Sequence, residues 1–240
     1  MKLDLGIADR AQETAIYIPD GFSKGGNIDI VLYLHGFQQP DGVVSISQYL
    51  MKDYGQLRQR LNASQRNVIL VAPTLGPHSQ PGNLTAQGGL DVFLGRTLAT
   101  IRAHAGDGWP DVLVLRNLIV ACHSGAGVDE RELAGGSAKA LASLKSSWGY
   151  ESLYHDGDVP FWSNWARDHE SSRLLLFYRP HNSTENAEMI RRCKSLGALG
   201  LANLIATPSN ASSHMLVPVT HFQSCLEGAA FLDRKPELVA

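Results

Sequence analysis

Short apolar runs alternate along almost the whole chain with segments that have the period of a helix. Several of the runs are apolar on both faces, as strands are when helices cover a parallel sheet. The runs predict strands over residues 15–18, 28–34, 68–72, 118–122, 144–150 and 174–178, and a shorter run predicts one over 204–206.

Between these runs the apolar residues step by three and four positions, which is the spacing of one face of a helix. The pattern predicts helices over 46–61, 90–101 and 189–196. A last helix is expected to open at Thr220, where Thr220 and Gln223 have the spacing of a capping box. This alternation predicts an α/β fold with a mainly parallel sheet and helices on both faces. In such sheets chemistry is expected at the carboxyl ends of the strands.

The length and composition favour one domain. The 240 residues are 44% hydrophobic, and a chain of this size buries enough surface to form a core. No linker, repeat or low-complexity tract interrupts the alternation, so we expect a single domain over 1–240. The three cysteines, Cys122, Cys193 and Cys225, are widely spaced and predict buried thiols rather than a disulfide framework or a zinc site.

Neither the net charge nor the hydropathy of the chain indicates a macromolecular partner. The formal net charge is -2, so no overall field attracts nucleic acid or anionic lipid. No run approaches the roughly 18 apolar residues of a membrane span. The first residues lack the apolar stretch of a signal peptide, which favours a cytoplasmic protein, although a signal peptide already removed would leave no trace. The sequence does not indicate the oligomeric state.

The most informative segment is 117–127, where a predicted strand ends and small residues lead towards a helix. Ser124 lies at this turn, with Cys122 and Ala126 two positions before and after it. The segment resembles the nucleophile elbow of α/β hydrolases, with Cys122 and Ala126 in place of glycines. A plain tight turn and a dinucleotide-binding loop are the alternatives, but the third glycine of the latter is missing.

A second part of the resemblance lies upstream, where the strand predicted over 28–34 runs into His35-Gly36-Phe37. In α/β hydrolases a His-Gly-X turn here supplies one N–H group to the oxyanion hole, and the residue after the nucleophile supplies the other. The resemblance therefore implies the N–H groups of Phe37 and Gly125. His35 is expected to hold the loop rather than to take part in catalysis.

A nucleophilic serine needs a base, and the base needs an acid that orients it. In α/β hydrolases the acid and then the histidine follow the serine along the chain. Glu151 directly ends the strand predicted over 144–150, which places it at the catalytic edge of the sheet, unless it is a solvated strand-end residue. Glu185 is explained by the dipole at a helix start. Asp156 and Asp158 are explained by a turn and the cap of the next helix.

The segment Gly149-Tyr-Glu-Ser-Leu-Tyr154 looks like a Leu-Asp-x-Leu-Tyr-Gly segment in a small bacterial group of α/β hydrolases. That group also has His-Ser-Gly at the elbow and a later histidine followed by x-x-(Val/Ile)-Pro. This chain has His123-Ser-Gly125 and His214-Met-Leu-Val-Pro218. The resemblance implies Glu151 as the acid, in place of the aspartate, and His214 as the base.

Two histidines precede or open the last predicted helix, His214 and His221. If Thr220 caps that helix, His221 lies in its first turn, where the positive end of the dipole disfavours the imidazolium that a base must become. His214 lies on the preceding loop, where catalytic groups are more often found. We expect His214 to be the base, with His221 as the alternative.

These residues predict a serine hydrolase that cleaves a small-molecule carboxylic ester by acyl transfer, with Ser124 as nucleophile and no metal or organic cofactor. An amidase or peptidase would use the same residues, and a non-catalytic binding protein on a hydrolase scaffold is the alternative from another class. Aromatic residues near the predicted acid would either line an acyl pocket or belong to the core. These are Trp148, Tyr150, Tyr154, Phe161, Trp162 and Trp165.

Overall fold

A computed structural model describes residues 13–37, 56–76, 79–104, 106–180 and 186–236. Its strands form one sheet in the order β1-β3-β2-β4-β5-β6-β7, in which β1 is antiparallel and the other strands are parallel. All seven predicted strands are confirmed. Their bounds are β1 Thr14–Tyr17, β2 Asn27–Leu34, β3 Ile69–Pro73, β4 Val114–His123, β5 Leu144–Tyr150, β6 Arg173–Tyr178 and β7 Leu204–Pro208.

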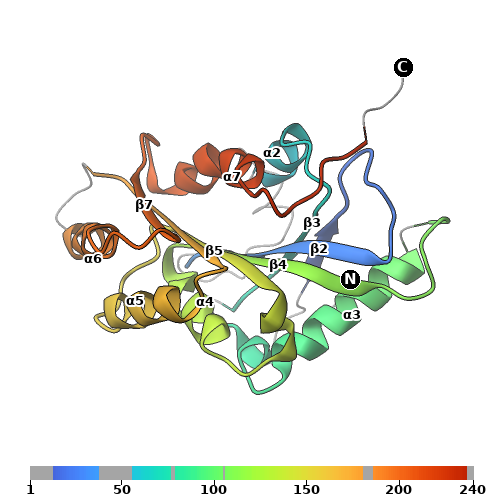
Figure 1. Ribbon diagram of the computed structural model, residues 1–240, viewed down its shortest axis with the longest axis horizontal. Coiled ribbons are helices and arrows are strands. Elements are labelled where there is room, and N and C mark those ends of the chain that lie inside the picture. Colours follow the sequence, from blue (N-terminus) through green and yellow to red (C-terminus); the bar gives the residue numbers. More distant parts are fainter. Residues whose placement is uncertain (1–12, 38–55, 77–78, 105, 181–185, 237–240) are drawn as a thin grey trace.

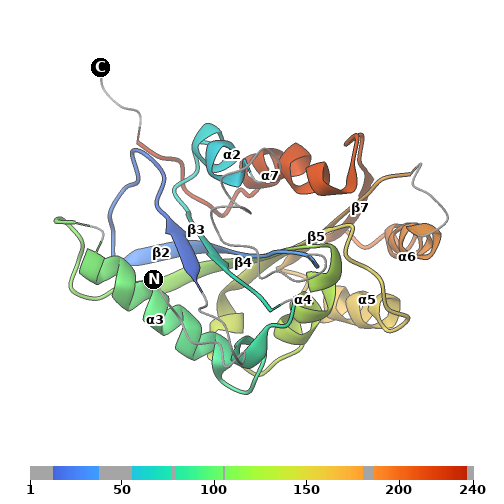
Figure 2. The ribbon, with the colours of Figure 1, turned by 180° about the vertical axis from the view of Figure 1, so that it is seen from behind.

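Helices cover both faces of the sheet, as predicted. In Figure 1, α2 and α7 lie above the sheet and α3, α4 and α5 lie below it; Figure 2 shows the same layers from behind. The side chains of α6 pack in the same core as those of α3 and α5. The bounds are α2 Leu57–Ala63, α3 Gly89–His104, α4 Gly127–Ala134, α5 Asp158–Asp168, α6 Ala187–Gly197 and α7 Val217–Glu227.

The interior strand β2 shows why helices are needed on both faces of the sheet. Ile28, Ile30, Leu32 and Leu34 pack in the core with α3, whereas Val31 and Tyr33 pack on the other face, in the core with α2 and α7. This alternation follows from the period of two of a strand. Both faces are apolar because both are buried, and this is the pattern from which the strand was predicted.

Two predicted helices, over 90–101 and 189–196, correspond to α3 and α6. The helix predicted over 46–61 is described only from residue 56, and α2 accounts for its last part. Its residues Ile46, Tyr49, Leu50 and Tyr54 lie outside the described residues, as does Glu185.

The start predicted for the last helix is wrong. Helix α7 begins at Val217, directly after a 3₁₀ turn over His214–Leu216, and Pro218 lies in its first turn. Proline is favoured there because the first N–H groups of a helix have no partner within the helix. The Thr220 hydroxyl donates to the Leu216 carbonyl at 2.8 Å, within the helix, and does not cap it.

None of the helices in the described segments combines the length and the apolar character needed to cross a membrane. Cys122, Cys193 and Cys225 are buried and unpaired, as predicted. Within the same segments, no group of three histidine, cysteine, aspartate or glutamate side chains is arranged to hold a metal ion.

Candidate active site

Ser124 lies at the carboxyl end of β4, in a sharp turn that leads into α4. Its φ is +55°, a left-handed conformation that costs an L-residue energy and is found mainly at functional sites. Neighbouring segments approach the turn closely because they lack side chains. A Cβ on Gly36 would lie 2.6 Å from the Ser124 Cβ, and one on Gly127 would lie 1.9 Å from the Ser152 carbonyl oxygen. The turn is therefore clamped between the loops after β2 and β5.

Cys122, two residues before Ser124, fits this turn because its thiol points into a buried polar cluster. The thiol donates to Glu130 Oε2 at 2.9 Å, and the Ser147 hydroxyl donates to Glu130 Oε1 at 2.8 Å. Burial raises the pKa of the Glu130 carboxyl to about 7. Burial and the Glu130 charge together raise the pKa of the Cys122 thiol well above its usual value, so the thiol is unreactive at neutral pH.

Glu151 follows β5 and is fully buried, with a φ of +47°. Its Oε2 lies 2.6 Å from Nδ1 of His214. A carboxylate only accepts hydrogen bonds, so this contact places a proton on Nδ1 and leaves Nε2 as the nitrogen that can accept another proton. The His214 side chain is 28% exposed, which keeps the ring accessible from the sheet edge.

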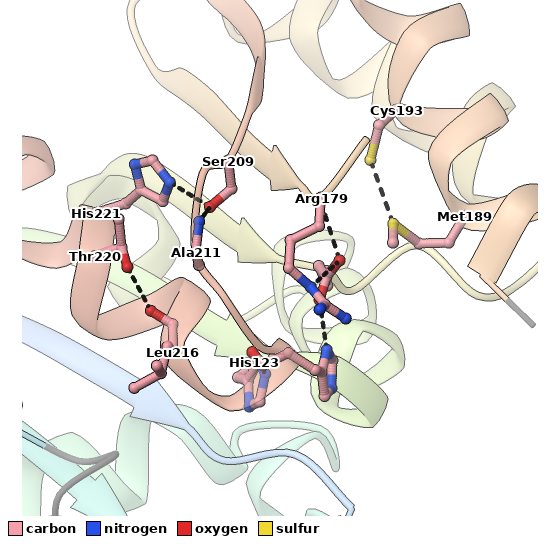
Figure 3. A network of polar contacts seen from close by, with 11 residues as sticks. His123, Arg179, Met189, Cys193, Ser209, Ala211, Leu216, Thr220 and His221 are labelled. Carbon is pink, nitrogen blue, oxygen red and sulfur yellow. Dashed lines mark hydrogen bonds and ion pairs between the residues drawn. The ribbon is translucent and has the colours of Figure 1, made fainter. Parts of the chain in front are cut away.

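Arg179, the first residue after β6, gives Glu151 its other partners. The Arg179 backbone N–H donates to Oε1 at 3.0 Å, and its guanidinium Nε donates to Oε2 at 3.1 Å (Figure 3). Burial would raise the pKa of the Glu151 carboxyl, but the hydrogen bonds and charges of His214 and Arg179 outweigh burial and lower it. Glu151 is thus held as a carboxylate. Arg179 was not predicted, although its place after a predicted strand puts it at the right edge of the sheet.

His221 lies in the second turn of α7 and contacts different residues. Its Nε2 lies 2.7 Å from the Ser209 hydroxyl (Figure 3). Its ring stacks on Phe177 at a centroid distance of 4.3 Å. Burial lowers the pKa of the His221 imidazole. The structure therefore brings His214, and not His221, to Glu151. His221 does not lie in the first turn of the last helix, where it was predicted, because α7 begins four residues before it.

The loop after β2 reaches the residue that follows Ser124. The position of a Cβ on Gly125 would lie 3.5 Å from the Phe37 nitrogen, so the two predicted oxyanion residues are adjacent. His35 is buried and fixes this loop: Leu75 N–H donates to its Nε2 at 2.8 Å, and its Nδ1 donates to the Gly36 carbonyl at 2.9 Å. Burial lowers the pKa of His35, which keeps the ring neutral in this role.

No family model and no curated protein matches the sequence, but solved structures share its fold. One is the BES protein from Bacillus cereus, with a TM-score of 0.57 and 8% identity over 95% of this chain and 93% of that chain. Another is a ferulic acid esterase, with a TM-score of 0.54 and 12% identity over 91% of each chain. A third is an IroE-like serine hydrolase from Shewanella oneidensis, with a TM-score of 0.51 and 13% identity over 88% of this chain and 72% of that chain. The chain has the α/β hydrolase fold.

Within this fold the predicted site residues come from separate strand ends. Ser124 follows β4, Glu151 follows β5, and His214 lies on the connection from β7 to α7. Because these strands are parallel, their carboxyl ends meet at one edge of the sheet, where α/β enzymes carry their chemistry.

His123 and Tyr154 extend this site beyond the predicted residues. The buried His123 ring lies 4.4 Å from the His214 ring, and its Nε2 lies 3.2 Å from the His214 carbonyl oxygen. Burial, and then the charge of Glu151, raise the pKa of the Tyr154 phenol to about 12, although a hydrogen bond with the Ser124 side chain acts in the opposite direction. The phenol therefore stays protonated at neutral pH and lies beside Ser124.

The other aromatic residues near Glu151 mostly belong to the core of the protein. Trp148 and Tyr150 are buried on the face covered by α7, whereas Trp162 and Trp165 are buried on the opposite face of the sheet. They cannot wall one acyl pocket, because the sheet separates the two pairs. Of the six aromatic residues, Tyr154 is the one that the structure brings to Ser124.

The two aspartates after Glu151 have structural partners. Asp158 opens α5, accepts the His155 backbone N–H at 2.9 Å and pairs with Arg131 at 2.8 Å. Asp156 is exposed and pairs with Arg192. The predicted turn is present, but the predicted cap is wrong: Gly157 occupies the cap position without a side-chain hydrogen bond, and Asp158 lies in the first turn of α5.

Proposed function

We propose that this α/β hydrolase cleaves carboxylic esters by acyl transfer, with Ser124 as nucleophile, His214 as base and Glu151 as the acid. The observation that carries the proposal is the 2.6 Å contact between His214 Nδ1 and the buried Glu151 carboxylate, at the sheet edge where Ser124 adopts a positive φ. A carboxylate in that position fixes the tautomer of the imidazole and stabilises the imidazolium that forms during the reaction.

The reaction proceeds in two halves. Ser124 Oγ attacks the ester carbonyl carbon while His214 Nε2 takes the hydroxyl proton, and the carbonyl oxygen becomes an oxyanion held by the N–H groups of Phe37 and Gly125. The C–O bond to the alcohol then breaks, and His214 returns the proton to the leaving alkoxide. A water molecule, activated by the same imidazole, releases the acid and restores Ser124.

Glu151 is suited to its part because it remains charged. Its pKa is lowered by His214 and Arg179 despite burial, so the carboxylate is ionised at neutral pH. Two separate elements, the turn that begins α7 and the end of β6, supply these partners. The orientation of His214 therefore depends on the segments that follow β5, β6 and β7, which carry Glu151, Arg179 and His214 itself.

An ester is the favoured substrate because its alkoxide leaving group needs less protonation than an amine. The shared fold with a ferulic acid esterase agrees with this choice. A small acyl substrate is proposed, with no nucleic acid partner. An amidase or peptidase would use the same residues, and the experiment below separates it from an esterase.

The test combines a fluorophosphonate probe with the activated ester p-nitrophenyl acetate and its anilide analogue. We expect wild type to take the label and to cleave the ester faster than the anilide, and Ser124→Ala to lose both labelling and turnover. Ser172→Ala is the matched control, because Ser172 is a buried serine at the opposite end of the sheet, where its hydroxyl donates to the Leu144 carbonyl at 2.7 Å. Wild type that stays unlabelled and cleaves neither substrate between about pH 6 and pH 9 would instead be a binding protein, and faster anilide cleavage would indicate an amidase.

A further inference from the structure

Ser79 has two unfavourable features that its local structure does not explain. It is 2% exposed and its φ is +59°, a conformation that glycine adopts at much lower cost. Its buried hydroxyl oxygen has no hydrogen-bond partner among the described residues. Burying an unpaired hydroxyl lowers stability, so a serine here is disfavoured by both its backbone and its side chain.

The hydroxyl lies beside Gly125, one of the two residues proposed to hold the oxyanion. Ser79 Oγ is 3.7 Å from the position that a Cβ would occupy on Gly125, and the Phe37 nitrogen is 3.5 Å from the same position. The backbone holds Ser79 there, because its N–H donates to the Gly76 carbonyl at 2.9 Å and the Gly76 N–H donates to the Gln80 carbonyl at 3.0 Å. These backbone hydrogen bonds therefore hold a buried hydroxyl next to Gly125.

We propose that the Ser79 hydroxyl is a third hydrogen-bond donor to the oxyanion, beside the N–H groups of Phe37 and Gly125. This assignment rests on the acyl-transfer function proposed above. The hydroxyl keeps its own proton and donates a hydrogen bond to the carbonyl oxygen, which gains negative charge as Ser124 attacks.

In the part of the chain that the structure describes, the Ser79 hydroxyl has no hydrogen-bond partner. A donor that is unpaired in the free enzyme gains its bond only when the oxyanion forms, so the interaction is stronger in the transition state than before it. Such differential binding raises kcat. The positive φ has the same explanation, since strained residues persist where their position serves the reaction. The Ser172 hydroxyl, at the opposite end of the sheet, has a protein partner instead, the Leu144 carbonyl.

The decisive variant is Ser79→Gly, which removes the hydroxyl and also suits the positive φ. We expect kcat for p-nitrophenyl acetate to fall on the order of 10²-fold, with little change in KM and with a melting temperature equal to or above that of wild type. Ser79→Ala, which keeps the strained backbone, should show the same loss of kcat. The rate of fluorophosphonate labelling should fall in parallel, because the phosphoryl oxygen of the probe enters the same hole.

Ser172→Ala again serves as the control, and here we expect a lower melting temperature with kcat unchanged. If wild type shows Ser124-dependent turnover but both Ser79 variants keep kcat and labelling rate within about threefold of wild type, well short of the loss expected for an oxyanion donor, the assignment of Ser79 is overturned and the proposed function stands. If wild type shows no Ser124-dependent turnover, the proposed function fails and the assignment of Ser79 fails with it.

Discussion

The buried carboxyl of Glu130 makes the stability of this protein depend on pH, and Glu130→Gln should remove that part of the dependence. Glu130 accepts hydrogen bonds from the Cys122 thiol and the Ser147 hydroxyl. A glutamine can replace it there, because its carboxamide oxygen can accept from Ser147 and its NH₂ group can donate to the Cys122 sulfur.

The magnitude follows from the pKa. Burial raises the pKa of Glu130 from 4.5 to about 7, the charge of Asp158 acts in the same direction, and the bonds from Cys122, Ser147 and the Trp148 N–H oppose it. The folded protein therefore binds this proton more tightly than the unfolded chain, so the contribution of Glu130 to stability is largest below pH 4.5 and is lost as the pH rises towards 7. At 1.36 kcal/mol for each pKa unit, the loss is about 3 kcal/mol.

Urea unfolding of wild type and Glu130→Gln, followed by tryptophan fluorescence at several pH values, measures this difference. Glu130→Gln should be close to wild type below pH 4.5 and more stable by about 3 kcal/mol above pH 7. The contribution of Asp129, whose pKa burial raises to about 8, is common to both proteins and cancels. Retained phosphonate labelling of Ser124 is the control for an intact turn. A stability difference that stays constant with pH, or that shrinks as the pH rises, would contradict a raised pKa of Glu130 in the folded protein.

Three further outcomes are expected. His214→Ala should lower kcat by at least about 10³-fold, whereas the kcat of His221→Ala should stay within a few-fold of that of wild type. The opposite result in the same esterase assay would make His221 the base. Arg179→Met removes a charge that lowers the pKa of Glu151, so the acidic limb of the pH profile of kcat/KM should move up by about one unit, and an unmoved limb would contradict this. Gly127→Ala places a methyl group 1.9 Å from a carbonyl oxygen and should cost about 3 kcal/mol or more in urea unfolding; an unchanged unfolding midpoint would show that the close approach is absent.

The strands were predictable because their pattern is local. A strand buried on both faces must be apolar throughout, and 68–72 and 118–122 show this directly in the sequence. The order of the strands and the antiparallel direction of β1 were not predictable, because they depend on pairings between distant segments. The start of α7 was misplaced for a related reason: the capping-box spacing at Thr220 is a local signal, but the helix begins earlier, at a turn followed by Pro218.

Some residues of the candidate site were likewise predictable from the sequence and others were not. Ser124 and Glu151 end apolar runs, so their position at the sheet edge was predictable, and the contact between His214 and Glu151 agrees with the expected pairing. Arg179 and Ser79 lie on connections without periodic pattern, and no short motif marks them. Their importance comes from what packs against them, which the sequence alone does not specify.

The assembly of the site from separate strand ends has a consequence for folding. Glu151 and His214 are 63 residues apart in the chain, and contacts of such long range form late because closing large loops costs chain entropy. Helices such as α3 contain only local hydrogen bonds and can form much earlier. Recovery of turnover after dilution from urea should therefore lag behind recovery of the circular dichroism signal, and the lag would report how late the contact between Glu151 and His214 forms.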